Sequence, residues 1–441
     1  MVLPRKNKRR YIIIVNVCRW LLALVLMLSG FLKAADPVGG VYKLQEYVTA
    51  FSLSVPDGWL MAATITQATL EFLIGLYLFV GVYRTVVPFM ALLAMSLFTP
   101  FSLYLWVSGV VSDCGCFGES LAMSNGMTFV KNVVLLLLAV VTFVKRSLFI
   151  GCLDRKIRWV LVLFSWIYIF GLQTVAVNHL PLVDSGLYTV GNNLRAMVAY
   201  TPGSYRYMSV YEKDGEEVVL PADSVAAEGW TLVDSYSEQI APGSEPEIPN
   251  FSIVDWEYDI EVADELLADT GYVCIVVVED VESASVTHVD KLNDLYDYCS
   301  ANGVGFCAVS SSGQDEALLW TKRTGAEYAM YWADKALLRA MIHSNPGLLL
   351  LKDGVIVGKW AVADIPVMDD RGDAKTSITS AVATSYTNVQ NWPFWVIVLV
   401  CALLLFSLLN MIIALSGIKP RARAEKEAYK PVVDEKTSDM N

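Results

Sequence analysis

Six long apolar stretches constrain the fold of this chain more than any other feature. They cover residues 11–33, 61–82, 86–108, 127–144, 158–178 and 393–415. A helix needs about 20 such residues to cross the hydrocarbon core of a bilayer, so we predict a polytopic α-helical membrane protein with six spans. With 55% hydrophobic and 18% charged residues, the chain is too polar for a bundle of spans alone. We therefore expect an additional polar domain.

The charges divide the chain in the same way. Residues 180–391 carry 12 basic and 33 acidic residues, a net charge of −21, whereas the remainder carries 21 basic and 12 acidic residues, a net charge of +9. The polar domain is therefore strongly acidic. A nucleic-acid-binding surface needs positive charge, so we expect no nucleic acid among the partners.

Basic residues indicate which side of the membrane each loop faces. They cluster before the first stretch, between the fourth and fifth, and after the sixth, and Arg84 lies in the turn between the second and third. The positive-inside rule assigns these regions and both termini to the cytoplasm. We therefore expect segments 34–60, 109–126 and 179–392 to lie on the opposite, outer side of the membrane. Arg19 argues against a cleavable signal peptide, because it lies within what would be the apolar core of that peptide.

Two ionisable residues lie deep within the predicted spans. Along a helix, Arg19 lies about 13 Å from Arg10, and Glu71 lies about 19 Å from Arg84. Because an unpaired charge is costly in lipid, we predict a structural intramembrane pair between Arg19 and Glu71. The alternative is a protonated Glu71, with Arg19 reaching separately to the interface.

The stretch Cys114-Gly115-Cys116 is the best candidate for chemistry in the sequence. A disulfide between positions i and i+2 closes a small, strained ring, and strained disulfides tend to be oxidising and labile. We interpret Cys114 and Cys116 as a redox pair. Two alternatives stay open: a static loop structure, or a metal site in which Asp113 adds a third ligand. Lys131 either reaches outward to the interface or stabilises a thiolate of the pair.

Three segments resemble the DoxX and MauE membrane protein families. They are CRWLLALVLMLSGFLKAADPVG (18–39), ATLEFLIGLYLFVG (68–81) and DCGCFGES…MTFVKNVVLL (113–136), and the resemblance covers about residues 11–146. It implies a four-helix membrane module. MauE is associated with the maturation of methylamine dehydrogenase, whose small subunit carries many disulfides. The vitamin K epoxide reductase-like proteins are a looser analogy that suggests a quinone, but they use Cys-x-x-Cys rather than Cys-x-Cys, and no cofactor is otherwise evident.

Strands and helices alternate in the acidic domain. We predict strands at 272–278, 304–309 and near 327–331, helices at 287–301, 314–324 and 334–343, and hairpins at 205–220 and 347–360. This order resembles the thioredoxin fold, and the resemblance implies a cis peptide bond before Pro346. The place of the usual Cys-x-x-Cys motif reads EDVESASVTH (279–288) and has no cysteine. We therefore expect a redox-inactive, partner-binding domain with His288 at its surface.

Three cysteines remain in this domain, on stretches that face the predicted core. We expect Cys274, Cys299 and Cys307 to be buried free thiols that pack as small apolar groups. The alternative is a disulfide between Cys299 and Cys307.

These patterns divide the chain into seven segments. They are a four-helix DoxX/MauE-like module (1–150), a fifth transmembrane helix (151–180), a β-rich segment with a linker at 237–250 (181–250), the thioredoxin-like domain (251–365), a linker (366–392), the sixth transmembrane helix (393–416) and a cytoplasmic tail (417–441). We interpret the protein as a thiol–disulfide or maturation factor of the bacterial cell envelope, located in the inner membrane with its large domain on the periplasmic side. Its expected partners are the lipid bilayer and an unidentified envelope protein. The alternative is a non-enzymatic membrane scaffold in which Cys114 and Cys116 only hold a loop.

Overall fold

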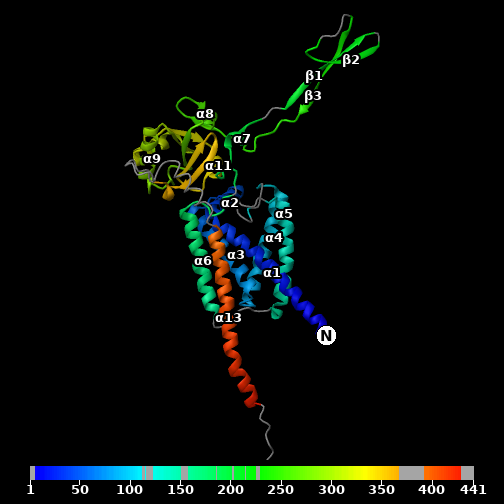
Figure 1. The fold of residues 1–441 in the computed structure, drawn as a ribbon, viewed down its shortest axis with the longest axis vertical. Coiled ribbons are helices and arrows are strands. Elements are labelled where there is room, and N and C mark those ends of the chain that lie inside the picture. The colour runs from blue at the N-terminus through cyan, green and yellow to red at the C-terminus, as the bar shows by residue number, and fades with distance from the viewer. Residues whose placement is uncertain are drawn as a thin grey trace, which may run out of the picture. The chain divides into compact units, whose positions relative to one another are not determined.

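The computed structural model describes residues 5–111, 115, 123–149, 157–184, 186–200, 203–213, 215–224, 229–366 and 392–428 (Figure 1). The chain divides into two units, one of residues 1–186 and 386–441 and the other of residues 187–385. This division separates the apolar stretches from the acidic part of the sequence.

In the part of the chain that the structure describes, the first unit contains six helices that are long and apolar enough to cross a membrane. They are α1 (Arg5–Ala35), α3 (Asp57–Val80), α4 (Val86–Ser108), α5 (Asn125–Val144), α6 (Arg158–Asn178) and α13 (Trp392–Ala428). Each overlaps one predicted span, so the prediction of a polytopic membrane protein is confirmed. Leu28, Leu97 and Leu137 remain exposed on these helices, as expected of side chains that contact lipid.

The ends of these helices follow from the local sequence. α3 and α4 each stop at a glycine, Gly81 and Gly109, whose positive φ ends a helix without Cβ strain. α5 begins after Ser124, whose hydroxyl accepts a hydrogen bond from an amide of the first turn. The side chain of Asn125 donates to the carbonyl of Val111 at 2.6 Å, which ties the start of α5 to the segment that follows α4.

α1 and α3 pack so closely that backbone meets backbone. Gly30 of α1 lies against the backbone of Phe72, and Gly75 of α3 lies against that of Ala23 and Met27. A Cβ at either glycine would collide with the opposite helix, so this packing depends on the two small residues. The earlier residues of α1, Ala23 and Met27, contact the later residue of α3, Gly75, whereas the later Gly30 contacts the earlier Phe72. The two helices are therefore antiparallel.

A further helix, α2 (Pro37–Ala50), occupies a segment for which the sequence predicted only an outer loop. The carboxylate of Asp36 accepts a hydrogen bond from the Gly39 amide at 2.9 Å, and Pro37 occupies the first helical position. Both features are typical of a helix start.

A mixed seven-stranded sheet forms the centre of the second unit, in the order β10-β9-β6-β7-β8-β4-β5. The strands are β4 (Ile253–Asp255), β5 (Ile260–Glu261), β6 (Tyr272–Val278), β7 (Gly305–Ser310), β8 (Met330–Ala333), β9 (Gly347–Lys352) and β10 (Val355–Ala361). β6, β7 and β8 are parallel, and the other pairs are antiparallel. The predicted strands and the closing hairpin are confirmed, whereas β4 and β5 are additions.

A helix follows each of the three parallel strands. α9 (Val289–Asn302) follows β6, α10 (Gln314–Thr324) follows β7 and α11 (Lys335–Met341) follows β8. The core packs Val276 and Val278 of β6 near Leu292 and Leu295 of α9 and near Trp320, all at most 2% exposed. Short helices complete the chain: η1 (Arg146–Leu148), α7 (Leu194–Val198), α8 (Ala263–Ala268) and η2 (Val362–Asp364).

The second unit also contains a three-stranded antiparallel sheet of order β2-β1-β3. Its strands are β1 (Ser204–Lys213), β2 (Glu216–Pro221) and β3 (Thr231–Ala241). β1 and β2 form the predicted hairpin. The predicted linker at 237–250 is wrong over its first residues, because Ser237 and Glu238 pair with Tyr207 and Arg206 of β1. Local proline content does not reveal a pairing between distant strands.

Candidate functional site in the membrane module

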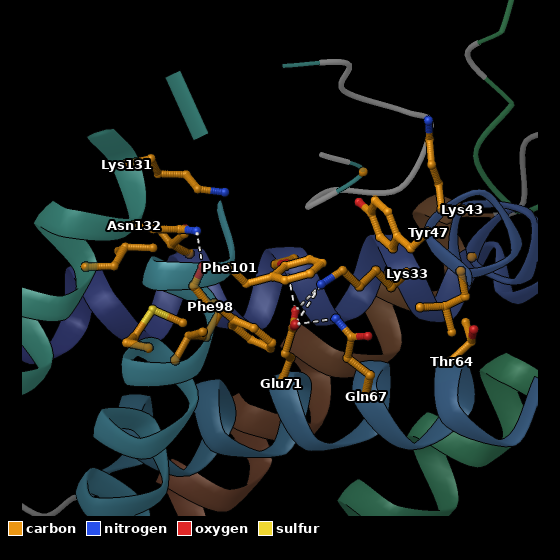
Figure 2. A pocket seen from close by; sticks show the side chains of 18 of the residues that line it. Lys33, Lys43, Tyr47, Thr64, Gln67, Glu71, Phe98, Phe101, Lys131 and Asn132 are labelled. Carbon is orange, nitrogen blue, oxygen red and sulfur yellow. Dashed lines mark hydrogen bonds and ion pairs between the residues drawn. The ribbon is translucent and has the colours of Figure 1, made fainter. Parts of the chain in front are cut away.

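A pocket of about 190 Å³ lies in the first unit, and polar side chains of several helices meet in it (Figure 2). Its wall is formed by α1, α2, α3, α4 and α5, with Gly115 added from the segment between α4 and α5. Apolar wall residues are Val25, Leu26, Leu44, Met95, Phe98, Phe101 and Leu135. An apolar cavity of about 150 Å³ holds a benzene molecule, so this pocket has room for a side chain or a small ring.

Glu71 is the centre of the polar network in this pocket. Its carboxylate accepts hydrogen bonds from Lys33 Nζ at 2.6 and 2.8 Å, from Ser29 Oγ at 2.7 Å and from Gln67 Nε2 at 3.2 Å. Glu71 is only 4% exposed, so these bonds replace the water that a carboxylate otherwise needs. Lys33 Nζ also lies 5.9 Å from the centre of the Phe98 ring, within the range of a cation–π contact.

The predicted ion pair between Arg19 and Glu71 is wrong. Glu71 takes Lys33 as its cation. The guanidinium carbon of Arg19 instead lies 5.1 Å from the centre of the Phe149 ring, close to the chain segment that follows α5. Arg19 is fully buried and therefore packs as part of the first unit.

The packing of α1 against α3 explains why these two residues do not meet. Gly30 lies level with Phe72, and Ser29 hydrogen-bonds to Glu71, so Glu71 lies at the level of Ser29 in α1. Arg19 is ten residues from Ser29 in the same helix, so it lies about 15 Å from Glu71 along the axis. The prediction counted the depth of Arg19 from Arg10 and that of Glu71 from Arg84, and it assumed that these two flanking arginines lie in one membrane plane. The contacts between α1 and α3 instead show directly which residues of the two helices lie side by side.

A second polar network joins α4 and α5 at the pocket wall. Asn132 Nδ2 donates to Ser102 Oγ at 3.1 Å and to the Phe98 carbonyl at 3.5 Å, and Thr99 Oγ1 donates to the Asn132 carbonyl at 3.3 Å. Asn132 is 4% exposed. Lys131, the preceding residue of α5, lines the pocket, and its side chain points toward the pocket interior in Figure 2. The structure therefore places this predicted site residue at the pocket.

Gly115 connects the pocket to the predicted redox motif. It lines the pocket and has a φ of +50°, a conformation that glycine adopts without strain. A Cβ at this position would lie 3.1 Å from Cγ of Lys43 on α2, so the Gly115 backbone packs on that side chain. Cys114 and Cys116, together with Asp113, lie outside the described residues, and their chemistry stays a prediction.

Sequence reasoning missed Lys33, Lys43 and Tyr47 as pocket residues. Lys33 ends the first apolar stretch and therefore looked like a flanking charge. Lys43 and Tyr47 lie one turn apart on α2, a spacing that puts them on one helix face. The sequence Asp36-Pro37 was the available signal, because an acidic N-cap followed by proline marks a helix start.

The second unit contains the remaining predicted residues. The peptide bond between Asn345 and Pro346 is cis, the isomer expected from the thioredoxin resemblance. The Asn345 side chain donates to the Asp280 carbonyl at 3.0 Å and to Ser283 Oγ at 3.1 Å, which ties the segment before β9 to the segment that lacks Cys-x-x-Cys. His288 precedes α9 and is exposed, as predicted. Across the residues that the structure describes, no group of three His, Cys, Asp or Glu side chains could hold a metal ion.

The three cysteines of the second unit are buried free thiols, as predicted. Burial raises the pKa of Cys307 to about 12. The predicted alternative, a bond between Cys299 and Cys307, is not formed. The sulfur neighbour of Cys299 is Cys274, with the two Sγ atoms 3.7 Å apart.

The long apolar helices define a polytopic helical membrane protein that also carries a sheet-containing α/β unit. Residues 11–145 match the family described as methylamine utilisation protein MauE. The matched region runs from α1 to α5 and includes every residue that lines the pocket. No curated protein and no solved structure matches the chain.

Proposed function

We propose that this protein is a thiol–disulfide or maturation factor of the bacterial cell envelope, and that Cys114 and Cys116 carry its chemistry. The observation that supports this best is the position of Gly115, which lies between these cysteines in the sequence and lines the pocket beside Lys131. The match to MauE over residues 11–145 gives coarser support, since it favours a membrane protein of a maturation or utilisation system.

Thiol–disulfide exchange needs a thiolate and a group that stabilises its charge. Lys43 packs against Gly115, and Lys131 lines the same pocket. An ammonium group near a thiol lowers its pKa and favours the thiolate. The thiolate of one cysteine attacks a client disulfide, forms a mixed disulfide and releases the second client sulfur as a thiolate. The other cysteine then attacks the mixed disulfide, so that Cys114 and Cys116 end oxidised and the client reduced. The reverse sequence oxidises a client dithiol.

We further propose that the second unit binds the client as a thioredoxin-like domain. Support comes from its sheet, in which β6 and β7 are parallel and β9 and β10 form an antiparallel hairpin, and from the cis bond before Pro346. Its segment 279–288 lacks a Cys-x-x-Cys motif, so this domain holds a partner without the usual dithiol chemistry. The distribution of basic residues supports a position of this domain on the side opposite the cytoplasm, which in the bacterial inner membrane is the periplasmic side.

A trapping experiment tests this function. A Cys116→Ser variant of the full chain, made in the cells that normally produce the protein, should accumulate a mixed disulfide through Cys114 that disappears on reduction. Cys18→Ser is the matched control, because Cys18 lies in α1 outside the motif and should trap nothing. If neither Cys116→Ser nor Cys114→Ser accumulates a mixed disulfide at normal protein abundance, the exchange function is refuted.

A non-enzymatic membrane scaffold is the second candidate function. Asn125 donates to the carbonyl of Val111, and Gly115 packs on α2. Ordinary contacts therefore already position parts of the segment between α4 and α5, and the cysteines would only reinforce it. A Cys114→Ser/Cys116→Ser double variant with full function and normal abundance would favour the scaffold. Loss of function at normal abundance would favour exchange.

A further inference from the structure

Two buried thiols of the second unit lie in contact. Cys274 on β6 and Cys299 on α9 are 2% and 0% exposed, and their Sγ atoms are 3.7 Å apart. The S–S length of a disulfide is about 2.05 Å, so each sulfur has to move by less than about 1 Å to form one.

The sheet and the helix direct these two side chains toward each other. Cys274 shares a face of β6 with Val276 and Val278, because alternate residues of a strand point to the same side. Leu295 and Cys299 lie one turn apart on the buried face of α9 and belong to the same core cluster. The thiols are therefore brought together by the packed core of the unit.

We propose that Cys274 and Cys299 form a disulfide that links α9 to the central strand β6 when the protein meets a disulfide oxidant such as oxidised glutathione. The two thiols lose two electrons and two protons, and one S–S bond forms between them. The S–S bond of the oxidant breaks, and the oxidant is released as two thiols. Cys114 and Cys116 take no part in this reaction.

The hydrogen bond between the two thiols gives them different roles. The bond from Cys274 lowers the pKa of Cys299, whereas the same bond and burial raise the pKa of Cys274. Because the thiolate is the attacking species, Cys299 attacks the oxidant and Cys274 then resolves the mixed disulfide. Neither sulfur is exposed, so the attack requires α9 to be undocked, during folding or local opening. Once α9 docks again, the finished bond is shielded from reductants.

Cys307 supplies an internal control. It lies on the neighbouring strand β7 and is 3% exposed, so it is buried to the same degree as the pair. Its register partner is Ile275, which points to the opposite face of β6 from Cys274. The sheet therefore separates Cys307 from the pair, and we expect it to stay a free thiol.

Differential alkylation of the full chain tests the disulfide. The protein is isolated without reductant, incubated with oxidised glutathione at a sub-denaturing urea concentration, and labelled with N-ethylmaleimide in denaturant. It is then reduced and labelled with iodoacetamide. We expect the iodoacetamide label on Cys274 and Cys299 and the maleimide label on Cys307. Cleavage after Phe306 separates Cys299 from Cys307 for mass spectrometry.

Two variants and a measurement of stability in urea complete the test. Cys307→Ala should keep the linked peptide, and Cys274→Ala should abolish it. Closing a loop of about 25 residues should also raise, by about 1 M or more, the urea midpoint at which Cys307 becomes reactive. The inference is overturned if all three cysteines carry the maleimide label, if Cys299 is linked to Cys307, or if the linked protein shows an unchanged midpoint.

Discussion

Replacing Lys33 with methionine is the most direct test of the polar network in the pocket. The substitution keeps an unbranched side chain, one atom shorter than that of lysine, and removes its charge. It leaves the carboxylate of Glu71, which is 4% exposed, with hydrogen bonds from Ser29 and Gln67 but without its cation. Removing one partner of a buried ion pair costs about 3–5 kcal/mol, because the remaining charge stays desolvated. We expect Lys33→Met to lower the free energy of unfolding by this amount.

A double-mutant cycle separates this penalty from the net contribution of the pair. Glu71→Gln keeps the shape of the side chain and removes its charge. We expect the Lys33→Met/Glu71→Gln variant to be more stable than Lys33→Met alone, with a coupling energy of about 1–3 kcal/mol. Lys43→Met is the matched control. The pair of Lys43 with Glu46 has a similar length of 2.9 Å, but the two side chains are 18% and 40% exposed, so its loss should cost less than about 1 kcal/mol.

The assay is unfolding of the full chain in detergent by increasing dodecyl sulfate, followed by circular dichroism. The abundance of each variant in the membrane is measured in parallel. Strictly additive effects of the two substitutions would refute the conclusion that Lys33 and Glu71 stabilise the bundle as a pair. If Lys43→Met lowered the free energy of unfolding as much as Lys33→Met, the conclusion that burial makes the Lys33–Glu71 pair more costly to break would be refuted.

Three further substitutions test other contacts. Gly115→Ala should lower the thermal midpoint and alter the alkylation rate of the neighbouring thiols. The reason is that a Cβ at this position is strained at a φ of +50° and lies 3.1 Å from Lys43 Cγ. Gly58→Ala is the control, because its Cβ meets nothing within 4 Å, and it should change neither quantity. Gly75→Val should sharply reduce folded protein in the membrane, since its side chain collides with the α1 backbone; wild-type abundance would contradict the close packing. Burial raises the pKa of the Cys307 thiol from 9.0 to about 12. As the pH rises from 9 toward 12, the thiol therefore ionises in the unfolded state but not in the folded state, and the second unit should lose stability over this pH range. Cys307→Ala should flatten this part of the stability–pH profile, measured by urea unfolding.

Local patterns were sufficient for the long helices and for most of the second unit. The apolar length of each span is a property of one continuous segment, which is why all six appear near their predicted bounds. The β-branched run at 272–278 and the Asp-Gly turn at 353–354 are equally local, and they correspond to β6 and to the β9–β10 hairpin. In these segments the side-chain preferences of the local sequence decide between helix, strand and turn, and contacts with neighbouring elements do not change the outcome.

Contacts between distant segments could not be read in this way. α2 has a local start signal at Asp36, yet its short length and mixed composition resemble those of a loop. β3 became visible only through its pairing with β1. The one cysteine pairing that the sequence suggested, as an alternative to free thiols, joined Cys299 to Cys307, eight positions away, whereas the structure brings Cys299 to Cys274, twenty-five positions away. Sequence distance is a poor guide to spatial distance once a helix folds back onto a sheet.

The sequence by itself determined that this chain is a membrane protein with an acidic α/β unit, because hydrophobic length and charge distribution act on each segment separately. It also directed attention to Glu71, since a carboxylate within an apolar span requires a partner. Only the tertiary structure decided that this partner is Lys33 and that Gly115 and Lys43 share its pocket. The physical reason is that the close approach of α1 and α3 at Gly30 and Gly75 sets the relative levels of the two helices, and those levels determine which charges can meet.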